Sequence, residues 1–453
     1  MKESSEMILQ NASMKKLFLN LCIPTIVVMI VVVLYNMTDI FFIGKTGDLD
    51  QVAAISLSGP YFSALQGLGT LLGGGGCILI SMLLGQKKEK QLKNVTSFCC
   101  YSSLLLGIVF ATVTLLFMEP VMTVLGAAGQ TRAYAVRYIR ILGLGAPAIL
   151  FAGVFANIIR ADGSALQSMI ANGAGTLTNI LLDPVLILGL RMGIEGAAIA
   201  TVAGNLVSCI YLAWYIGTRQ KHFSLHIKDL SLSRTVWQAP ILGAPQAIST
   251  ILMSFSHVFA NRLLLTYGDI AVAASGIASK AGMLIVMIIM GICMGLQPAI
   301  SYNYAAGNKG RLRKIILTFL SVTTIFSCLA AGLIILRRDP VIRIFMKEEA
   351  LSEYGRMMLT GSLAGAPVYG IIQLSTAFLQ AAGKPACATV LSLLQKAVVY
   401  VPALYLMNLC FGLGGLSFAP SVTDIIVSIA GALFAVQCYR SAPGSPEFTP
   451  EPV

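Results

Sequence analysis

Apolar residues gather into twelve long segments that are separated by short polar loops. A helix that crosses a membrane needs about 20 mostly apolar residues, and each segment meets that length. The segments show none of the weak alternation that is typical of a membrane β-barrel. We therefore predict an all-α membrane protein with twelve transmembrane helices. The predicted spans cover 17–43, 52–84, 95–118, 136–159, 166–190, 193–217, 237–265, 271–305, 315–336, 357–380, 386–409 and 416–438.

The two halves of the chain repeat each other. Six short landmarks recur in the same order, about 219 to 222 residues apart, which is strong evidence of a duplication. Each half holds six spans, so the second half enters the membrane from the same side as the first. A parallel repeat of this kind predicts two pseudo-symmetric six-helix bundles with a substrate site between them. The matching landmarks are 22–24 with 243–245, 85–87 with 307–309, 119–121 with 339–341, 145–147 with 365–367, 161–163 with 381–383 and 192–196 with 411–415.

This repeat also predicts the domain organisation. Residues 15–217 form an N-lobe with helices 1–6, and residues 237–440 form a C-lobe with helices 7–12. Residues 218–236 form a cytoplasmic lobe connector. Residues 441–453 are rich in Pro, Gly and Ser, so we expect a flexible tail or a remnant of cloning.

Composition agrees with a membrane protein. Of the 453 residues 57% are hydrophobic and 11% are charged, whereas about a quarter are charged in a soluble domain. The ten cysteines include no C-x-x-C pair and suit a reduced apolar interior. The net charge of +12 comes from basic loops rather than from a nucleic-acid surface. Those loops all lie on one side if both termini are cytoplasmic, as expected for a multi-pass protein of the inner (plasma) membrane.

Acidic residues inside the predicted spans are candidates for function, because charges in hydrocarbon are costly. Asp39 and Asp183 lie inside spans, and Asp424 fits either a span or its edge. At ~1.5 Å per residue, Asp39, Asp183 and Thr201 reach a similar depth in the outer half of the N-lobe. Asn179 is one turn from Asp183 and shares its face. These oxygens predict a site that binds a hard cation or holds a proton between two acids.

The C-lobe lacks matching acids. Ala260 or Asn261 stands where Asp39 would repeat, and Tyr400 or Val401 stands where Asp183 would. The C-lobe offers other polar groups in its spans, of which His257 and Lys396 are candidate polar sites. His257 is a candidate proton relay, or else a hydrogen-bonded contact between helices. Lys396 is a candidate partner of a carbonyl or a carboxylate, or a gate of the cavity, or else a side chain that snorkels to the interface.

Two further features bear on mechanism. Pro24 lies inside the first span and removes a backbone hydrogen bond, which permits a bend. That bend is either a fixed kink or a hinge that responds to Asp39. The run Gly73–Gly76 lacks the ending of a phosphate-binding loop, and it predicts either close helix packing or a flexible segment.

Several stretches together resemble the multidrug and toxic compound extrusion (MATE) transporters, and in particular the DinF-like branch. The resemblance covers residues 15–440. It rests on LYNMTDIFFIGKTG at 34–47, VAAISLSGP at 52–60, FANIIRADG at 155–163, TNILLDPVLI at 178–187 and MGIEGAAIATVAGN at 192–205.

The resemblance implies a function and a set of site residues. It implies efflux of amphipathic or cationic compounds against inward H+ or Na+, and a bend at Pro24. It maps the cation-coupling site, a candidate Na+ site, to Asp39, Asn179, Asp183 and Thr201, with Ala197 as a further ligand. It adds Tyr35, Asn36, Tyr138 and Asn157 as network neighbours.

Other functions remain as alternatives. A lipid or lipid-linked oligosaccharide flippase can have the same architecture, although the few basic residues in these spans favour it less. A membrane enzyme is disfavoured because no nucleophile, base or metal motif is present, so we predict a protein that is not an enzyme. A ligand-gated channel fits the duplicated lobes and paired carboxylates less well. We expect a monomer with small-molecule and lipid-bilayer partners, no nucleic acid, and no cofactor besides the coupling ion.

Overall fold

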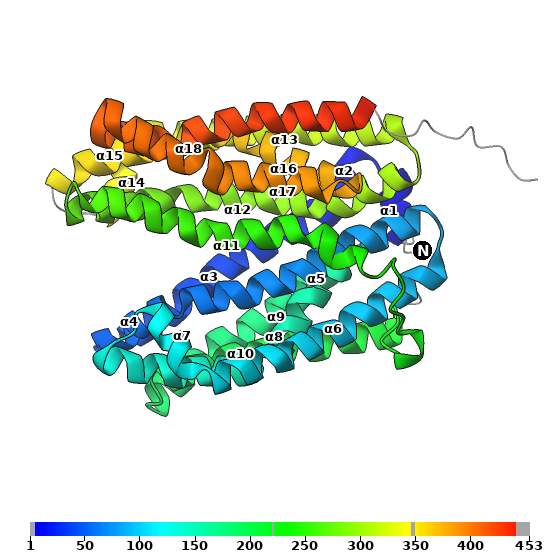
Figure 1. Cartoon of the computed structure of the whole chain (residues 1–453), viewed down its shortest axis with the longest axis horizontal. Coiled ribbons are helices and arrows are strands. Elements are labelled where there is room, and N and C mark those ends of the chain that lie inside the picture. The colour runs from blue at the N-terminus through cyan, green and yellow to red at the C-terminus, as the bar shows by residue number, and fades with distance from the viewer. Residues whose placement is uncertain (1–4, 220–221, 346–348, 441–453) are drawn as a thin grey trace, which may run out of the picture. The chain divides into compact units, whose positions relative to one another are not determined.

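The structure is a computed structural model that describes residues 5–219, 222–345 and 349–440 (Figure 1). Side chains at 5–7, 34–37, 40, 254, 269, 281, 341, 343–345 and 349–352 lie outside this description. Regular structure in the described ranges is helical throughout, without a β-strand. The predicted tail at 441–453 lies outside the described residues.

The first half of the chain runs through ten α-helices and three segments of other helical type. Two short helices and a π-helical turn precede the long helix that carries Asp39. The elements are α1 (Ser5–Asn11), α2 (Met14–Leu17), η1 (Phe18–Cys22), α3 (Ile23–Gly44), α4 (Leu49–Leu57), α5 (Gly59–Gly85), α6 (Glu89–Leu116), α7 (Met118–Leu125), α8 (Gly129–Ile158), α9 (Ala165–Asp183), η2 (Pro184–Gly189), α10 (Ile194–Arg219) and the 3₁₀ turn η3 (Ile227–Asp229).

The second half follows the same order with small differences. Its elements are α11 (Gln238–Leu265), α12 (Asp269–Ala305), α13 (Lys309–Leu336), α14 (Arg338–Phe345), α15 (Glu349–Leu363), α16 (Ala366–Ala381), α17 (Pro385–Leu393), η4 (Leu394–Val398) and α18 (Tyr400–Arg440). Short helices α7 and α14 hold corresponding positions, and π-helical turns interrupt corresponding spans at η2 and η4.

The predicted fold class is confirmed. Eleven helices of the described chain are long and apolar enough to cross a membrane. The last of them runs from Pro385 to Arg440 and covers two predicted spans. Gly412, at φ 57° and ψ −139°, interrupts it between those two spans. The helices therefore account for all twelve predicted segments.

Local sequence explains where several helices begin. The Asp48 carboxylate accepts hydrogen bonds from the backbone amides of Asp50 and Gln51 at 3.0 and 3.4 Å and so caps α4. Pro60 stands in the first turn of α5, where the missing N–H has no helical partner to lose. Span 2 is thus built from two helices, α4 and α5, rather than from one.

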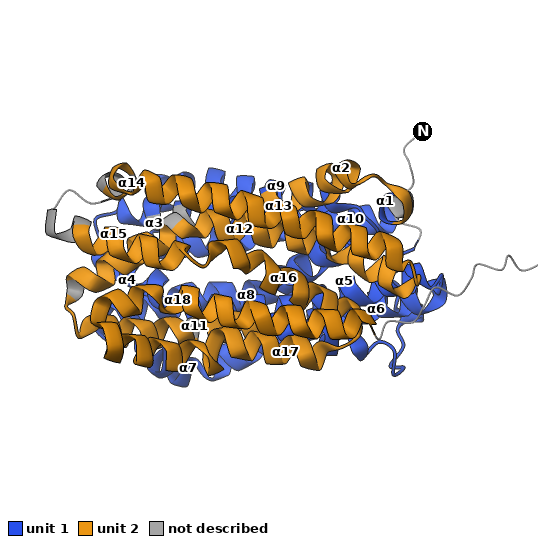
Figure 2. Cartoon of the chain, turned by 90° about the horizontal axis from the view of Figure 1, so that it is seen from above, with its two compact units in different colours: residues 1–9, 27–247 blue, residues 10–26, 248–453 orange. Residues whose placement is uncertain are grey.

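The chain divides into two compact units. Unit 1 comprises residues 1–9 and 27–247, and unit 2 comprises residues 10–26 and 248–453 (Figure 2). The first part of span 1 thus groups with the second half of the chain. The first part of α11 groups with the first half. The predicted lobes are consecutive stretches of the chain, whereas the two units are defined by contacts between residues. The predicted lobe bounds therefore remain a prediction.

Glycines explain how α11 packs within unit 1. A Cβ on Gly75 of α5 would lie 1.8 Å from the Ala239 carbonyl oxygen, and a Cβ on Gly243 would lie 2.0 Å from the Leu71 carbonyl oxygen. Only glycine leaves room for backbones this close. The close packing predicted for Gly73–Gly76 is therefore confirmed.

Unit 2 repeats this contact with different helices. A Cβ on Gly295 of α12 would lie 2.7 Å from the Leu21 carbonyl oxygen, and a Cβ on Gly291 would lie 2.7 Å from the Cα of Ile26. The Cys22 thiol also donates to the Ile292 carbonyl at 3.8 Å. The start of span 1 is thus held on α12 by backbone contact.

Pro24 lies in the first turn of α3, directly after the π-helical turn η1. A π-helical turn is a widened turn that often accompanies irregular points in a helix. The Thr25 hydroxyl donates to the Leu21 carbonyl at 2.7 Å. The boundary between the two units falls after Ile26. Pro24 therefore marks a break in helix type as well as in hydrogen bonding.

Candidate cation-coupling site

Four polar side chains meet inside unit 1. They are Asp39 from α3, Asn179 and Asp183 from α9, and Thr201 from α10. Their exposed fractions are 5%, 1%, 0% and 1%. The Asn179 amide donates to Asp39 Oδ1 at 3.3 Å, and the Thr201 hydroxyl donates to Asp39 Oδ2 at 3.4 Å. The structure thus brings together the residues that were selected by depth.

The site has more acceptors than donors. Both carboxyl oxygens of Asp183 and the Asn179 Oδ1 atom are buried without a donor from a nitrogen or a hydroxyl group. The Asp183 and Asp39 carboxyl groups interact with each other. Two interacting acids in a buried site cannot both ionise cheaply, so one of them tends to hold a proton. Buried acceptors without donors call for a proton or a cation.

Helix geometry explains this convergence. Asn179 and Asp183 are four residues apart on α9 and share a face. Ala197 and Thr201 have the same spacing on α10, and Ala197 is fully buried. Pro184 follows Asp183 and begins the π-helical turn η2. The widened turn therefore starts at the acid itself, as π-bulges often do at functional sites.

The predicted network neighbours separate into three groups. Tyr138 of α8 is 7% exposed, hydrogen-bonds to Thr201 and interacts electrostatically with both carboxyl groups. The side chains of Tyr35 and Asn36 lie outside the described residues. Asn157 is not joined to the site, because it lies 19 residues after Tyr138 on α8, roughly 28 Å along the helix.

Asn157 instead belongs to the opposite end of α8. Its amide donates to the Gly153 carbonyl at 2.7 Å, and its Oδ1 accepts from the Arg160 guanidinium. Arg160 is 5% exposed. Asn157 therefore holds a buried arginine at the end of the helix.

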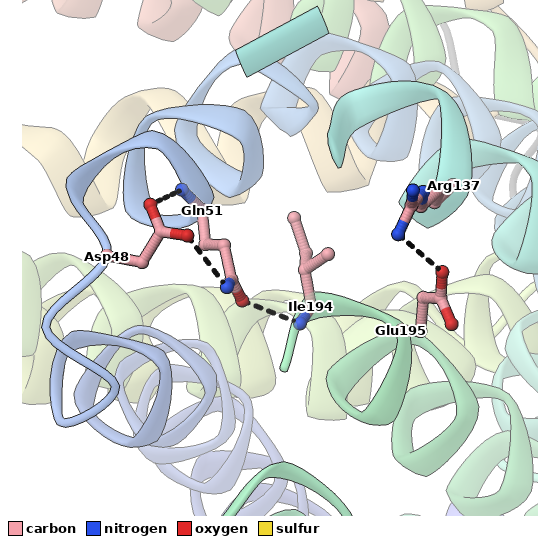
Figure 3. Close-up of polar contacts among 5 residues, drawn as sticks. All are labelled: Asp48, Gln51, Arg137, Ile194 and Glu195. Carbon is pink, nitrogen blue, oxygen red and sulfur yellow. Dashed lines mark hydrogen bonds and ion pairs between the residues drawn. The ribbon is translucent and has the colours of Figure 1, made fainter. Parts of the chain in front are cut away.

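A polar network lies at the ends of the helices that carry the site (Figure 3). Gln51 links two elements: its Nε2 donates to Asp48 Oδ2 at 3.0 Å, and its Oε1 accepts from the Ile194 amide at 2.9 Å. Arg137 of α8 pairs with Glu195 of α10 at 3.4 Å. These contacts connect the loop after α3 with the starts of α4 and α10, and they connect α8 with α10.

Gly193 makes the first of these connections possible. Its φ of +55° is in the left-handed region, and a Cβ would lie 2.5 Å from Gln51 Oε1. The left-handed backbone favours glycine, and any larger residue would also have to displace the Gln51 side chain. This explains physically why a glycine precedes α10 in the MGIEG landmark.

The chemistry of the site follows from its oxygens. The described chain holds no group of three or more His, Cys, Asp and Glu side chains that could bind a metal ion. A sodium ion would therefore draw on amide, hydroxyl and carbonyl oxygens besides the two carboxylates. A proton needs only the two facing acids, since two adjacent acids cannot both ionise cheaply.

The two candidate polar sites of the C-lobe lie in unit 2. His257 is exposed, whereas Lys396 is half-buried. Lys396 lies in the π-helical turn η4, and its backbone carbonyl accepts a hydrogen bond from the Ser256 hydroxyl group. Gln395 donates to Asp424 Oδ1 at 3.0 Å. The sequence left open whether Asp424 lies inside a span or at its edge. The structure places it in the interior of α18.

A protein-family model decides the family. The model, described as MatE, matches residues 24–185 and again residues 245–406. The chain belongs to the MatE family. The two matches also confirm the internal duplication, and MatE proteins are transporters rather than enzymes.

Curated MatE relatives align along nearly the whole chain. The multidrug export protein MepA of Staphylococcus aureus (strain NCTC 8325 / PS 47) is 32% identical over 436 residues, which are 96% of each chain. The multidrug export protein MepA of Staphylococcus saprophyticus is 30% identical over 434 residues, again 96% of each chain.

Solved MatE structures share the fold. A crystal structure of MATE in complex with MaL6 superposes with a TM-score of 0.92 at 24% identity, covering 97% of this chain and 99% of the other. An outward-facing multidrug resistance MATE family transporter of the MOP superfamily gives 0.91 at 24% identity, covering 98% and 99%. The two-lobed architecture predicted from the repeat is thus that of the family.

Proposed function

We propose that this MatE transporter exports amphipathic or cationic compounds by antiport against inward H+ or Na+. The facing carboxyl groups of Asp39 and Asp183 carry the proposal. They form a buried, acceptor-rich site that binds one monovalent cation. The names of the MepA relatives, which are multidrug export proteins, support drug-like compounds as the transported cargo.

Ion binding and export are coupled through alternating access. The site is expected to take up the ion from outside and to release it inside, and the exported compound moves in the opposite sense. The transporter is expected to act as a monomer in the plasma membrane with both termini in the cytoplasm. It needs no cofactor besides the coupling ion.

Pro24 is the proposed hinge of this cycle. It lies at the change from η1 to α3, 15 residues before Asp39 on the same span. A change of charge at Asp39 is proposed to bend span 1 there. Transport by Pro24→Ala at the wild-type rate would count against the hinge and leave a fixed kink.

The test is efflux from proteoliposomes. A fluorescent lipophilic cation is followed under an imposed proton gradient and, separately, under a sodium gradient. We expect one gradient to drive efflux by the wild type and Asp39→Asn to abolish it. Glu119→Gln, which removes an exposed carboxylate elsewhere, serves as the matched control and should keep the activity.

The outcomes separate the alternatives. Proton-driven efflux lost in Asp39→Asn assigns H+ to the site, and sodium-driven efflux lost in the same variant assigns Na+. Coupled efflux that survives in Asp39→Asn would sink the proposal. Absence of efflux under either gradient would favour a lipid or lipid-linked oligosaccharide flippase.

A further inference from the structure

The beginning of α4 is tied by hydrogen bonds to three helices of unit 1, namely α3, α8 and α10. Gln51 reaches α10, because its Oε1 atom accepts from the Ile194 backbone amide at 2.9 Å (Figure 3). Asp50 reaches α8, because its Oδ1 atom accepts from the Thr131 hydroxyl group at 2.7 Å. Asp48 supplies the link to α3. We call Asp48, Asp50 and Gln51 the α4 clamp.

The link from the α4 clamp to α3 runs through the loop between these two helices. Gln51 Nε2 donates to Asp48 Oδ2 at 3.0 Å. The Asp48 backbone amide donates to the Thr46 hydroxyl group at 3.4 Å, and this hydroxyl group donates to the Ile43 carbonyl at 2.7 Å. A series of hydrogen bonds thus joins the last turn of α3 to the first residue of α10.

Each of the three tied helices also carries a residue of the cation-coupling site. The tied residue and the site residue are four or seven positions apart, and these spacings keep both on one face of a helix. The distance between them is about 6 or 10 Å along the axis. The pairs are Ile43 with Asp39 on α3, Thr131 with Tyr138 on α8 and Ile194 with Thr201 on α10.

Buried apolar side chains of one core lie on the clamp side of the coupling site. Their exposed fractions are 2% or less, and they are Ile43, Ile187, Ile194 and Ala197. Ile187 follows Asp183 by four residues, and Ala197 precedes Thr201 by four. Because such an interior is close-packed, it transmits a displacement instead of absorbing it. A shift of α10 at Ile194 is therefore expected to reach Thr201.

We propose that Asp50 and Gln51 are positioning residues of the coupling site, and that the α4 clamp sets the affinity for the coupling ion. The Thr201 hydroxyl group donates to Asp39 Oδ2 at 3.4 Å, which is long for a bond between two oxygens. A small shift of α3 against α10 would break this bond. The inference rests on the proposed coupling of export to ion binding, but it concerns residues one to two turns away from that site.

The test is gradient-driven efflux from proteoliposomes at a series of concentrations of the coupling ion. We expect Gln51→Ala to raise the concentration for half-maximal efflux about threefold, which is within the effect of one lost hydrogen bond. The maximal rate should stay close to that of the wild type, since the residues that bind the ion are unchanged.

Gln167→Ala is the matched control. It also removes a hydrogen bond between a glutamine and α10, because the Tyr211 hydroxyl group donates to Gln167 Oε1 at 2.5 Å. Gln167 lies on α9, 16 residues before Asp183 and thus roughly 24 Å along the helix from it. The control should leave the half-maximal concentration unchanged. Equal increases in Gln51→Ala and Gln167→Ala would show a general loosening of the helices and overturn the proposal.

A double variant tests whether Gln51 acts through the coupling site. Residues that act independently have additive effects on free energy. We expect Gln51→Ala to change the half-maximal concentration less in a Thr201→Val background than in the wild type, because the bond that it disturbs is already absent. Full additivity would overturn the proposal. So would a half-maximal concentration for Gln51→Ala that equals that of the wild type.

A second variant covers the case in which Gln51→Ala does not fold. Thr131→Val removes the tie to α8 and should raise the half-maximal concentration too, whereas Thr131→Ser keeps the hydroxyl group and should not. Efflux that no ion gradient drives in the wild type would remove the proposed function, and this inference with it. Efflux that is lost in Asp39→Asn but unchanged in the clamp variants would remove this inference alone.

Discussion

Gly75 in α5 and Ala239 in α11 meet backbone to backbone, so closely that a Cβ on Gly75 would lie 1.8 Å from the Ala239 carbonyl oxygen. The contact joins residues 164 positions apart in the chain. It fixes the first part of α11 in unit 1, and the contact of Gly295 with Leu21 is its counterpart in unit 2. Packing of this kind leaves no room for adjustment by side-chain rotation.

Gly75→Ala is expected to destabilise the protein by about 1–3 kcal/mol, because the added methyl group must push two backbones apart. The midpoint of thermal unfolding in detergent, followed by size-exclusion chromatography, measures this. Gly173→Ala is the control, since a Cβ there meets nothing within 4 Å and alanine favours the helix. A Gly75→Ala protein as stable as the wild type would contradict the close contact.

Thr201→Val is expected to lower the apparent affinity for the coupling ion by roughly threefold to tenfold, since it removes one hydrogen bond worth about 1 kcal/mol. The hydroxyl donates to Asp39 Oδ2 and is 1% exposed. The ion concentration that gives half-maximal efflux measures the change. Thr201→Ser keeps the hydroxyl and should stay close to the wild type; equal losses in both variants would point to packing instead.

Gly193→Ala is expected to destabilise unit 1 by about 1–3 kcal/mol through its left-handed backbone and additionally through the clash with Gln51 Oε1. Gly47→Ala separates the two effects, because Gly47 has φ +75° but open space around its Cβ position. Thermal unfolding of both variants is the measurement. We expect a larger loss for Gly193→Ala, and an equal loss would show that the contact with Gln51 has no role.

The stability of the fold is expected to depend on pH through Asp48, which belongs to the network of Figure 3. Hydrogen bonds from the Gln51 and Tyr134 side chains lower the pKa of this carboxyl group. A lowered pKa in the folded state means that the ionised group stabilises the fold above its unfolded pKa. This contribution is lost as the pH falls through the folded pKa, below about pH 4.

Thermal unfolding between pH 3 and 6 checks this, as a comparison of the wild type with Asp48→Asn. We expect the difference in midpoint to shrink as the medium becomes acidic. Because Asp48 is only partly buried, the effect should be small and reduced by salt. A difference that stays constant over this range would contradict the role of the Asp48 charge.

The sequence was most informative where helical periodicity and depth decide the answer. Asp39, Asn179, Asp183 and Thr201 could be grouped before any coordinates, because the rise per residue fixes depth once the spans are placed. Tyr138 joins them through a resemblance, and the structure gives it a hydrogen bond to Thr201. Asn157 came from the same resemblance, but its position on α8 separates it from the site.

Contacts between distant segments could not be predicted in this way. The beginnings of span 1 and of α11 are as apolar as the rest of their spans, so nothing in their hydropathy tells which helices they contact. The sequence left open whether Asp424 lies inside a span or at its edge. Its hydrogen bond from Gln395 depends on how η4 and α18 pack, which periodicity alone does not give.

The division at Ile26 and Ala247 bears on how the chain could have arisen. Each unit completes its interior with a segment encoded in the other half of the gene. A single repeat, expressed alone, would lack that segment and expose the glycine surface that receives it. An ancestor with a single repeat would therefore have needed a dimer in which each copy placed its first segment in the other copy. Gene fusion would then have made this exchange permanent within one chain.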